Sequence, residues 1–449
     1  MKQDKTVDTS RELLNDDEFR CRHRKESRFF TRNRVLTFGI LAMLILQKSM
    51  KSIQLILNEF TSFFDLKPVT CSAFTQARSH LKHTAFIELN KKAIVNVVYE
   101  DGDYKRYKGR FRLLSIDGSK VILPNDEDIR KEFGAINYTN GKDDQIAGSK
   151  PQATASVMYD VLNHVAIDSI LGHSRAYEVD LAEEHLSCTC GNDLIPVDRN
   201  YTSYRFLACM SQYGRDFVGR CAKNSFKAVR ELFEGKGKDS RIVRLKPSDM
   251  KEVKELGLPE EIKIRFVRVR LDTGETEILV TSLIDDELYI TEEFKELYNM
   301  RWGVETFYGV LKTRLNLENF TGKTAESVKQ DFYATIYLTG SESVLTREVN
   351  EELEEKSSQV HNSNEDKKSE GKTPEYQHKV NKAVSFNAIK NHVFNLFYLE
   401  KDNDILSEKP EALFRMNTIC VRKGRKTERK KQSSDRLLNY HKRIRKICY

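Results

Sequence analysis

The middle of the chain alternates between short apolar strands and helices, and this alternation most constrains the fold. FRLLSID (111–117) and DLIPVD (193–198) are short apolar runs that each close on an aspartate. Residues 153–171 predict two further strands around an Asn163-His164 turn. Strands separated by helical segments indicate an α/β layer whose sheet is covered on its faces.

Asp117 and Asp198 occupy equivalent places, each at the carboxyl end of its strand. Open α/β sheets build their sites at this edge. Two carboxylates delivered there by neighbouring strands repel unless a cation lies between them, and Mg²⁺ prefers carboxylate, water and phosphate oxygens. The alternative is that each Asp only caps a turn, because Asp-Gly is a common turn pair. Since Gly118 follows Asp117, the sequence predicts that the strand ends there in a hairpin with SKVILP.

The segment YNMRWGVETFYGVLK (298–312) predicts a helix with a polar stripe beside a core face. An ordinary solvated helix with one Arg301–Glu305 ion pair is the alternative. With a turn of about 100° per residue, four polar residues fall within an arc of about 60°: Tyr298, Arg301, Glu305 and Lys312. The apolar residues fall on a separate face: Leu297, Met300, Val304, Phe307 and Leu311.

This stripe suits a phosphodiester substrate. Glu305 is a candidate third metal ligand, and two metals about 4 Å apart can clamp the attacking and leaving oxygens of a phosphodiester. Arg301 and Lys312 are candidates for holding phosphates, and Tyr298 adds a hydroxyl. Trp302, the only Trp of the chain, lies beside the stripe, where it either stacks on an unpaired base or packs at the helix edge.

The charge is concentrated at one end of the chain. The net charge is +8, but residues 420–449 carry 12 Lys/Arg against Glu428 and Asp435, a net of +10 (12 − 2). Such a tail predicts either a polyanionic partner or a solubilising end. A second candidate for DNA binding is TCSAFTQARSHL (70–81), which fits a DNA-recognition helix or a plain amphipathic helix equally well.

Other features place the protein inside the cell. The longest apolar run, Val35–Leu46, has 12 residues, whereas a membrane span needs roughly 20, so it predicts a buried helix. Eight cysteines scattered through a chain without a signal peptide predict reduced thiols. The cluster of His185, Cys188 and Cys190 lacks the paired spacing of zinc ribbons, which disfavours a metal there.

The sequence resembles the DDE transposases of bacterial insertion sequences, specifically the group named after insertion sequence four. That group's signature is Y-x₂-R-x₃-E-x₆-K, and residues 298–312 fit it at every interval. SIDGS (115–119) resembles the first-Asp motif and VDRNYTSYRF (197–206) the second. Asn200 stands where the second motif usually has Gly, and Asn is the residue that next best tolerates a positive φ.

The resemblance implies a ribonuclease-H-like core in which Asp117, Asp198 and Glu305 bind two Mg²⁺ or Mn²⁺ ions. The enzyme would cut phosphodiesters at the ends of its element and join them to target DNA, in the bacterial cytoplasm on the nucleoid. Its partners would be the element's terminal inverted repeats, target DNA and a second copy in the synaptic complex. A DNA-binding protein without catalysis and a metal-dependent nuclease remain the alternatives.

The expected class is α/β, with a β-rich insertion in the core, a helical N-terminal region for DNA binding and a helical, basic C-terminal region. The predicted divisions are a flexible N-terminus (1–28), the helical N-terminal region (29–110), the first part of the core (111–228), the insertion (229–290), the second part of the core with the Glu helix (291–346), a polar linker (347–380), and a C-terminal helix with the basic tail (381–449).

Overall fold

The computed structural model describes residues 2–32, 34–49, 51–139, 146–365, 377–398 and 403–421. It divides into two compact units that interleave along the chain. Since each unit draws on segments far apart in the sequence, the division differs from the linear one predicted above. The first unit comprises Met1–Gly102, Ile122–Pro151 and Leu311–Tyr449, and the second comprises Asp103–Val121 and Gln152–Val310.

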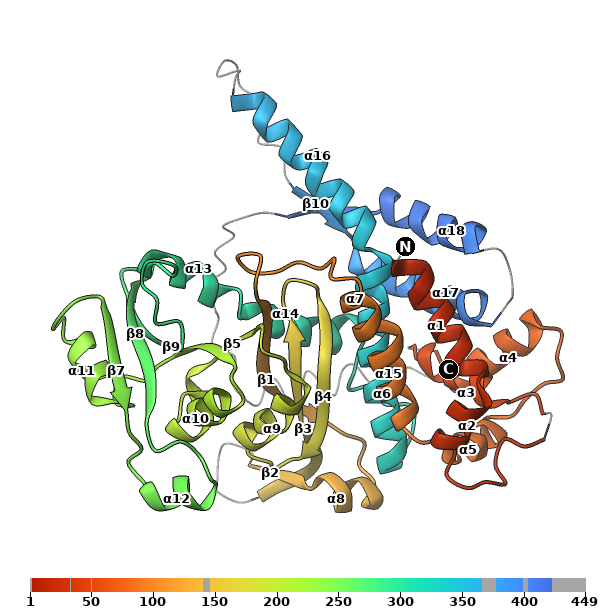
Figure 1. Cartoon of the computed structure of the whole chain (residues 1–449). Helices are drawn as coiled ribbons and strands as arrows, with labels where there is room; N and C mark the ends of the chain where they lie inside the picture. Colours follow the sequence, from red (N-terminus) through yellow and green to blue (C-terminus); the bar gives the residue numbers. More distant parts are fainter. Residues whose placement is uncertain are drawn as a thin grey trace. The chain divides into compact units, whose positions relative to one another are not determined.

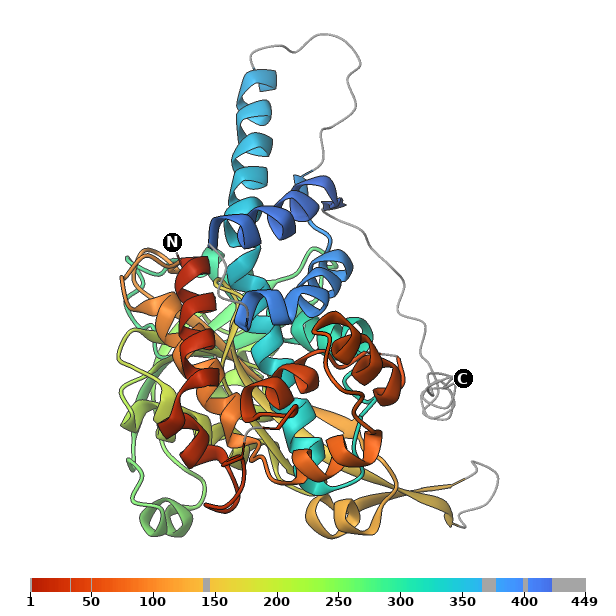
Figure 2. The ribbon, with the colours of Figure 1, turned by 90° about the vertical axis from the view of Figure 1, so that its right-hand side faces the viewer.

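Helices dominate the first unit, and α15 (Ala325–Leu345) runs through its centre (Figure 1). This helix is buried along most of its length and contacts α1, α3, α6 and α17, which Figure 2 shows around it in red, orange and blue. The predicted buried helix in Val35–Leu46 is confirmed as α3, whose nine residues are all buried. The helices before residue 100 are α1 (Lys2–Asn15), α2 (Asp17–His23), α3 (Phe38–Leu46), α4 (Ile53–Phe63), α5 (Cys71–Ser79), α6 (Thr84–Leu89), the π-helical η1 (Asn90–Asn96) and α7 (Val97–Tyr99).

The prediction of a flexible N-terminus is wrong, because α1 and α2 are packed helices. Phe19 is completely buried, and Leu14 is 4% exposed. The Ser10 hydroxyl lies 2.6 Å from the Tyr337 hydroxyl of α15. The Asp16 side chain caps α2 by accepting from the Phe19 amide. Apolar residues at helical spacing therefore anchor this charged segment to a partner far along the chain.

The predicted polar linker is also wrong for its first part, which forms α16 (Arg347–Glu365). Its Glu and Lys residues are good helix formers, and Arg347 pairs with Glu351 one turn on, at 2.9 Å. The predicted last helix is confirmed as α17 (Lys382–Phe397). It is followed by α18 (Asn403–Met416), and β10 (Gln377–Val380) pairs with β11 (Thr418–Val421). Most of the basic tail, residues 422–449, lies outside the described residues.

The second unit is built on a mixed sheet with the strand order β3-β1-β5-β6-β9-β8-β7, and β4 pairs with β3. β1, β5 and β6 are parallel neighbours, whereas the hairpins β3–β4 and β8–β9 are antiparallel. This arrangement confirms the α/β class and fits the expected ribonuclease-H-like core. The strands are β1 (Arg112–Ile122), β3 (Ile146–Asp160), β4 (Val165–His173), β5 (Asp193–Val197), β6 (Asp216–Arg220), β7 (Ser240–Leu245), β8 (Ile262–Arg270) and β9 (Thr276–Thr281).

Helices and turns in this unit follow the sequence closely. The turn before β4 holds His164 at a positive φ of 59°, and the β8–β9 turn holds Gly274 at 83°. The sheet is covered by α9 (Glu178–His185), α10 (Tyr204–Gln212), α11 (Lys227–Phe233) and α12 (Met250–Glu255). In the first unit, α8 (Glu127–Phe133) precedes β2 (Ala135–Thr139), which pairs with the start of β3.

Within the described residues, no helix is long and apolar enough to cross a membrane. The seven cysteines of this part of the chain are all free.

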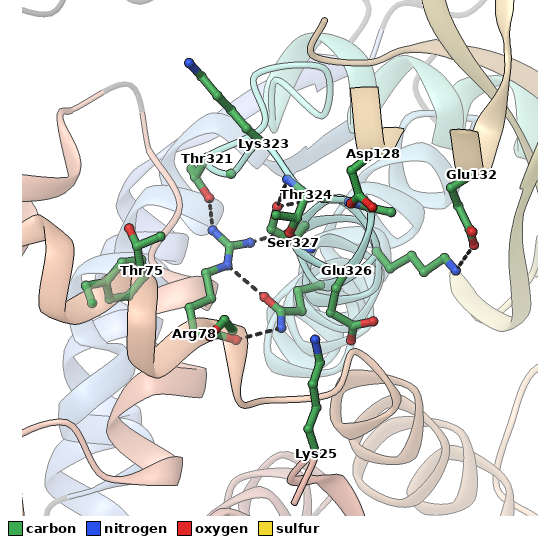
Figure 3. Close-up of a pocket in the computed structure, with 16 residues that line it drawn as sticks. Lys25, Thr75, Arg78, Asp128, Glu132, Thr321, Lys323, Thr324, Glu326 and Ser327 are labelled. Carbon is green, nitrogen blue, oxygen red and sulfur yellow. Dashed lines mark hydrogen bonds and ion pairs between the residues drawn. The ribbon is translucent and has the colours of Figure 1, made fainter. Parts of the chain in front are cut away.

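The one basic residue of the candidate recognition helix α5 is buried inside the first unit. Arg78 is buried and donates to Gln330, Thr321 and the Ser327 carbonyl, and it pairs with Asp331 at 2.8 Å. Figure 3 shows this guanidinium in the wall of a cavity of about 470 Å³. His80 stacks on Phe29, with 3.6 Å between ring centroids. The exposed face of α5 therefore carries only small or neutral polar residues: Ser72, Ala73, Thr75, Gln76 and Ser79.

Replacing Arg78 by Ala is expected to lower the free energy of unfolding by about 3–5 kcal/mol, because it strands the buried Asp331 carboxylate without its partner. The control is Arg415→Ala, which removes an arginine that pairs with Glu352 and Glu411 while 47% exposed. That change should cost less than about 1 kcal/mol. Urea denaturation measures both, and equal losses would contradict the structural role of Arg78.

Candidate functional site

The two predicted aspartates lie on neighbouring elements: Asp117 is within β1, and Asp198 directly follows β5. β1 and β5 pair in parallel, with Arg112 opposite Asp193 and Leu113 opposite Leu194. Asp117 lies five residues further along β1 than Arg112, and Asp198 lies five residues beyond Asp193, directly after the end of β5 at Val197. Neighbouring strands are about 4.8 Å apart, and paired residues of parallel strands point to the same face. The two carboxylates are therefore brought to one edge of the sheet.

The predicted hairpin after Asp117 is wrong, because β1 runs through Gly118 to Ile122. Val121 is completely buried, and the Lys120 amine donates to the Thr154 hydroxyl of β3 at 2.7 Å and to the Ser174 carbonyl. These distant contacts hold the strand extended where the Asp-Gly pair predicted a turn. Asp117 is thus fixed within a strand rather than at its end.

The Asp117 carboxyl group lies in a poorly solvated, acidic environment. Burial, above all, raises its pKa to about 6, and the negative charges of Glu305 and Glu178 add to the shift. The Gly118 amide, which donates to its Oδ1 at 2.9 Å, and the charge of Arg301 act in the opposite direction. In the described part of the chain, the Asp198 side chain makes no hydrogen bond or ion pair.

Asn200, which replaces the Gly of the second motif, has no need of a positive φ. It lies in the 3₁₀ turn η3 (Arg199–Tyr201) directly after Asp198, and it is absent from the residues with positive φ. The departure from the motif therefore leaves this turn unstrained.

The segment that carries the polar stripe is helical but not one regular α-helix. It consists of α13 (Phe294–Asn299), α14 (Trp302–Gly309) and the π-helical turn η5 (Val310–Arg314). At the junction, the backbone amide of Arg301 donates to the Tyr298 carbonyl, three residues earlier in the chain, and this bond tightens the turn. The core face is confirmed: Leu297, Val304, Phe307 and Leu311 are buried and Met300 is partly buried.

The stripe residues in the second unit agree in part with each of the two interpretations, a functional stripe and an ordinary helix with one ion pair. Arg301 pairs with Glu305 at 2.7 Å, as in the ordinary-helix alternative. However, Tyr298 is 4% and Arg301 3% exposed, so they do not form a solvated face. The Arg301 guanidinium carbon lies 5.6 Å from the Tyr298 ring centroid and 4.8 Å from that of Trp302. Burial raises the pKa of Tyr298, and the charge of Asp198 contributes.

Tyr308, which the sequence analysis did not identify, holds α14 against the sheet. Its hydroxyl donates to the Asp117 carbonyl at 3.0 Å and to the Ala155 carbonyl at 2.9 Å. One turn away, a Cβ on Gly303 would come within 2.9 Å of Val161, so Gly303 permits close packing against the turn after β3. The signal was present: at about 100° per residue, Tyr308 falls between the stripe and the core face.

Lys312 lies in the first unit, within η5. It is largely buried, which lowers its pKa, while Glu318 acts to raise it. The second unit therefore brings together Asp117, Asp198, Tyr298, Arg301, Trp302 and Glu305, and Lys312 belongs to the other unit.

The donor chemistry of this site fits a hard divalent cation. Asp117, Asp198 and Glu305 all act electrostatically on Arg301; burial and the charge of Glu305 raise the pKa of Asp117, and the Asp198 side chain caps no helix. In the described ranges, no three His, Cys, Asp or Glu side chains converge closely enough to hold an ion as they stand. Since the Glu305 carboxylate is paired with Arg301, the carboxylates are electrostatically coupled but not converged.

A second polar chain in this unit is structural. The His185 ring bonds to Asp168 at 2.7 Å and to the Ser156 hydroxyl at 3.0 Å, the order found in serine hydrolases. Both Ser156 and His185 are completely buried, so no substrate reaches the hydroxyl. The chain instead ties the end of α9 to β3 and β4, and it occupies both ring nitrogens of the histidine that lies near Cys188 and Cys190.

Replacing Asp117 by Asn is expected to stabilise the protein at pH 7 by on the order of 2 kcal/mol. Above pH 6 the carboxyl group is ionised in both states, and burial penalises the folded one; below its ordinary pKa of 3.8 it is protonated in both states and the penalty vanishes. The gain should therefore shrink as the pH falls from 6 to below 4. Thermal melting of this variant and of the surface control Asp180→Asn measures it, and a destabilised Asn variant at pH 7 would contradict the account.

Three comparisons place the chain among known proteins. Residues 108–338, about half of the chain, match the family model described as the transposase DDE domain. Transposase InsG for insertion sequence element IS4 of Escherichia coli (strain K12) is 27% identical over 191 residues, which are 41% of this chain and 42% of that protein, so the match spans less than half of the relative. The cryo-EM structure of the piggyBac transposase synaptic complex with hairpin DNA is 12% identical, with a TM-score of 0.45, covering 96% of this chain and 87% of that chain. The chain belongs to the DDE transposase family, of the type of insertion sequence element IS4.

Proposed function

We propose that this protein is a DNA transposase that cuts phosphodiesters at the ends of an insertion sequence and joins them to target DNA. One arrangement carries the proposal: Asp117 lies within β1, Asp198 directly follows the parallel strand β5, and Tyr308 anchors the helix of Glu305 to the backbone of Asp117. The family match and the InsG relative support the same reading.

Asp117, Asp198 and Glu305 are proposed to hold two Mg²⁺ or Mn²⁺ ions. When bound, such ions activate a water or DNA 3′-hydroxyl and stabilise the leaving oxygen. The protein's own contribution is positioning: the sheet fixes both aspartates, and Tyr308 fixes the depth of α14. Once Glu305 turns from Arg301 to a cation, the Arg301 guanidinium becomes available for a phosphate.

Double-stranded DNA is the proposed partner, as terminal repeats and as target, and a homodimer would hold the two ends in the bacterial cytoplasm on the nucleoid. Tyr298, Arg301 and Trp302 are the proposed contacts near the cut, and Lys312 of the first unit is a further proposed DNA contact. The N-terminal helices and the tail of 12 basic residues are proposed to bind flanking DNA, which predicts steep salt dependence. Because Arg78 is engaged internally, α5 would contribute through its neutral polar face.

Cleavage of DNA carrying the flanking inverted repeats, with Mg²⁺ present, tests the reaction. Asp117→Ala, Asp198→Ala and Glu305→Ala should each lower the cleavage rate by at least about a thousandfold, since each removes a proposed ligand of the cations. The control is Glu184→Ala, which removes an exposed carboxylate on α9 and should cut at the wild-type rate. Retained activity in the three variants would contradict the metal site. Tight binding without cutting would favour a DNA-binding protein, and cutting without joining would favour a nuclease.

The single Trp gives a direct measure of its own role. Trp302 is 37% exposed and lies beside the buried Arg301. If it stacks on an unpaired base, its fluorescence should be quenched by repeat DNA with an unpaired end and much less by the blunt duplex. Equal spectra with both DNAs would assign Trp302 to packing at the helix edge.

A further inference from the structure

Glu178 is a carboxylate beside Asp117 that the signature motifs do not include. It lies in the first turn of α9. A Cβ built on Gly118 would meet its Cδ at 2.8 Å and its Oε1 at 3.0 Å, so the carboxyl group rests directly on that glycine. Within the described residues, the Glu178 side chain makes no hydrogen bond or ion pair.

The place of Glu178 is fixed from both ends of its helix. His185, at the other end of α9, bonds to Asp168 on β4 and Ser156 on β3. Val179 and Ala182 between them are buried. Gly118 on β1 leaves room for the carboxyl group, because a side chain at this position would overlap it. Glu178 is therefore a positioned carboxylate rather than one at the end of a mobile loop.

Tyr201 is an independent sign that the side chains at the same place have another arrangement open to them. It is completely buried, and its hydroxyl makes no hydrogen bond of good geometry to any described residue. Its charged neighbours are Asp117, Glu178 and Asp198, which add to the burial that raises its pKa, while the Gly118 amide acts weakly against them. A buried hydroxyl without a partner costs about 1–3 kcal/mol, and a carboxylate that turned toward this hydroxyl would relieve that cost by accepting from it.

We propose that Glu178 is a fourth carboxylate of the divalent-cation site, acting with Asp117 and Asp198, and that the Tyr201 hydroxyl donates to these carboxylates when the cations are bound. The inference rests on the proposed function, because it presupposes cations at this edge of the sheet. The charges are compatible with it: two divalent ions carry +4, and Asp117, Asp198 and Glu305 carry −3 before any substrate phosphate enters. A fourth carboxylate balances the ions and leaves Arg301 free for a phosphate.

Binding of Mn²⁺ alone to the full chain tests the proposal without reference to activity. Isothermal titration calorimetry should show that Glu178→Gln weakens Mn²⁺ binding about ten- to a hundredfold, as expected for a carboxylate that supports a metal site. Glu184→Gln is the matched control, since Glu184 is exposed on the same helix and its side chain has no partner among the described residues. It should bind like the wild type. Equal affinities of the two variants overturn the proposal.

Asp198→Asn separates this failure from a failure of the proposed function. If it abolishes Mn²⁺ binding while Glu178→Gln does not weaken it, the transposase metal site stands and only the fourth carboxylate is rejected. If Asp198→Asn binds Mn²⁺ like the wild type, the metal site itself is rejected. Glu178→Asp shortens the side chain by one methylene and covers the case in which Glu178→Gln disturbs folding. The affinity of Glu178→Asp for Mn²⁺ should also fall, and wild-type affinity would overturn the proposal.

Discussion

Burial of the Asp117 carboxyl group beside other acidic side chains is the constraint around which the site in the second unit is organised. Asp117 lies within β1, and Asp198 directly follows β5, the parallel neighbour of β1. Burial raises the pKa of Asp117 above all, and the negative charges of Glu305 and Glu178 add to the shift. Only a positive charge opposes these negative charges.

In the structure, that positive charge is Arg301, which explains why its helix is packed so tightly. Arg301 is buried beside two aromatic rings, acts on both aspartates, and pairs with Glu305. Tyr308 holds the same helix to the Asp117 carbonyl. The arginine thus satisfies an acidic cluster that is unfavourable by itself. Such storage of unfavourable charge is typical of functional sites, where stability is lost in exchange for reactivity.

Residue spacing predicted those parts of the site that depend only on neighbouring residues in the sequence. The apolar strand residues before Asp117 and Asp198, and the core face of the Glu305 helix, follow from spacing alone. The continuation of β1 past Gly118 does not, because it depends on Lys120 reaching Thr154 and on Glu178 resting on the glycine. Helical angles likewise gave the direction of Arg301 but not its burial.

The errors elsewhere have the same origin. The N-terminal helices looked mobile because their anchor, Tyr337, lies 327 residues from Ser10. Arg78 looked available for DNA because Asp331 lies 253 residues away. Composition carries no information on such pairs.

The most direct test of the central claim is crystallographic: anomalous scattering from crystals of the protein soaked in Mn²⁺. The account predicts an anomalous peak in contact with carboxylate oxygens of both Asp117 and Asp198, with Glu305 turned away from Arg301. Peaks confined to other parts of the surface, with the Arg301–Glu305 pair intact at saturating Mn²⁺, would contradict it.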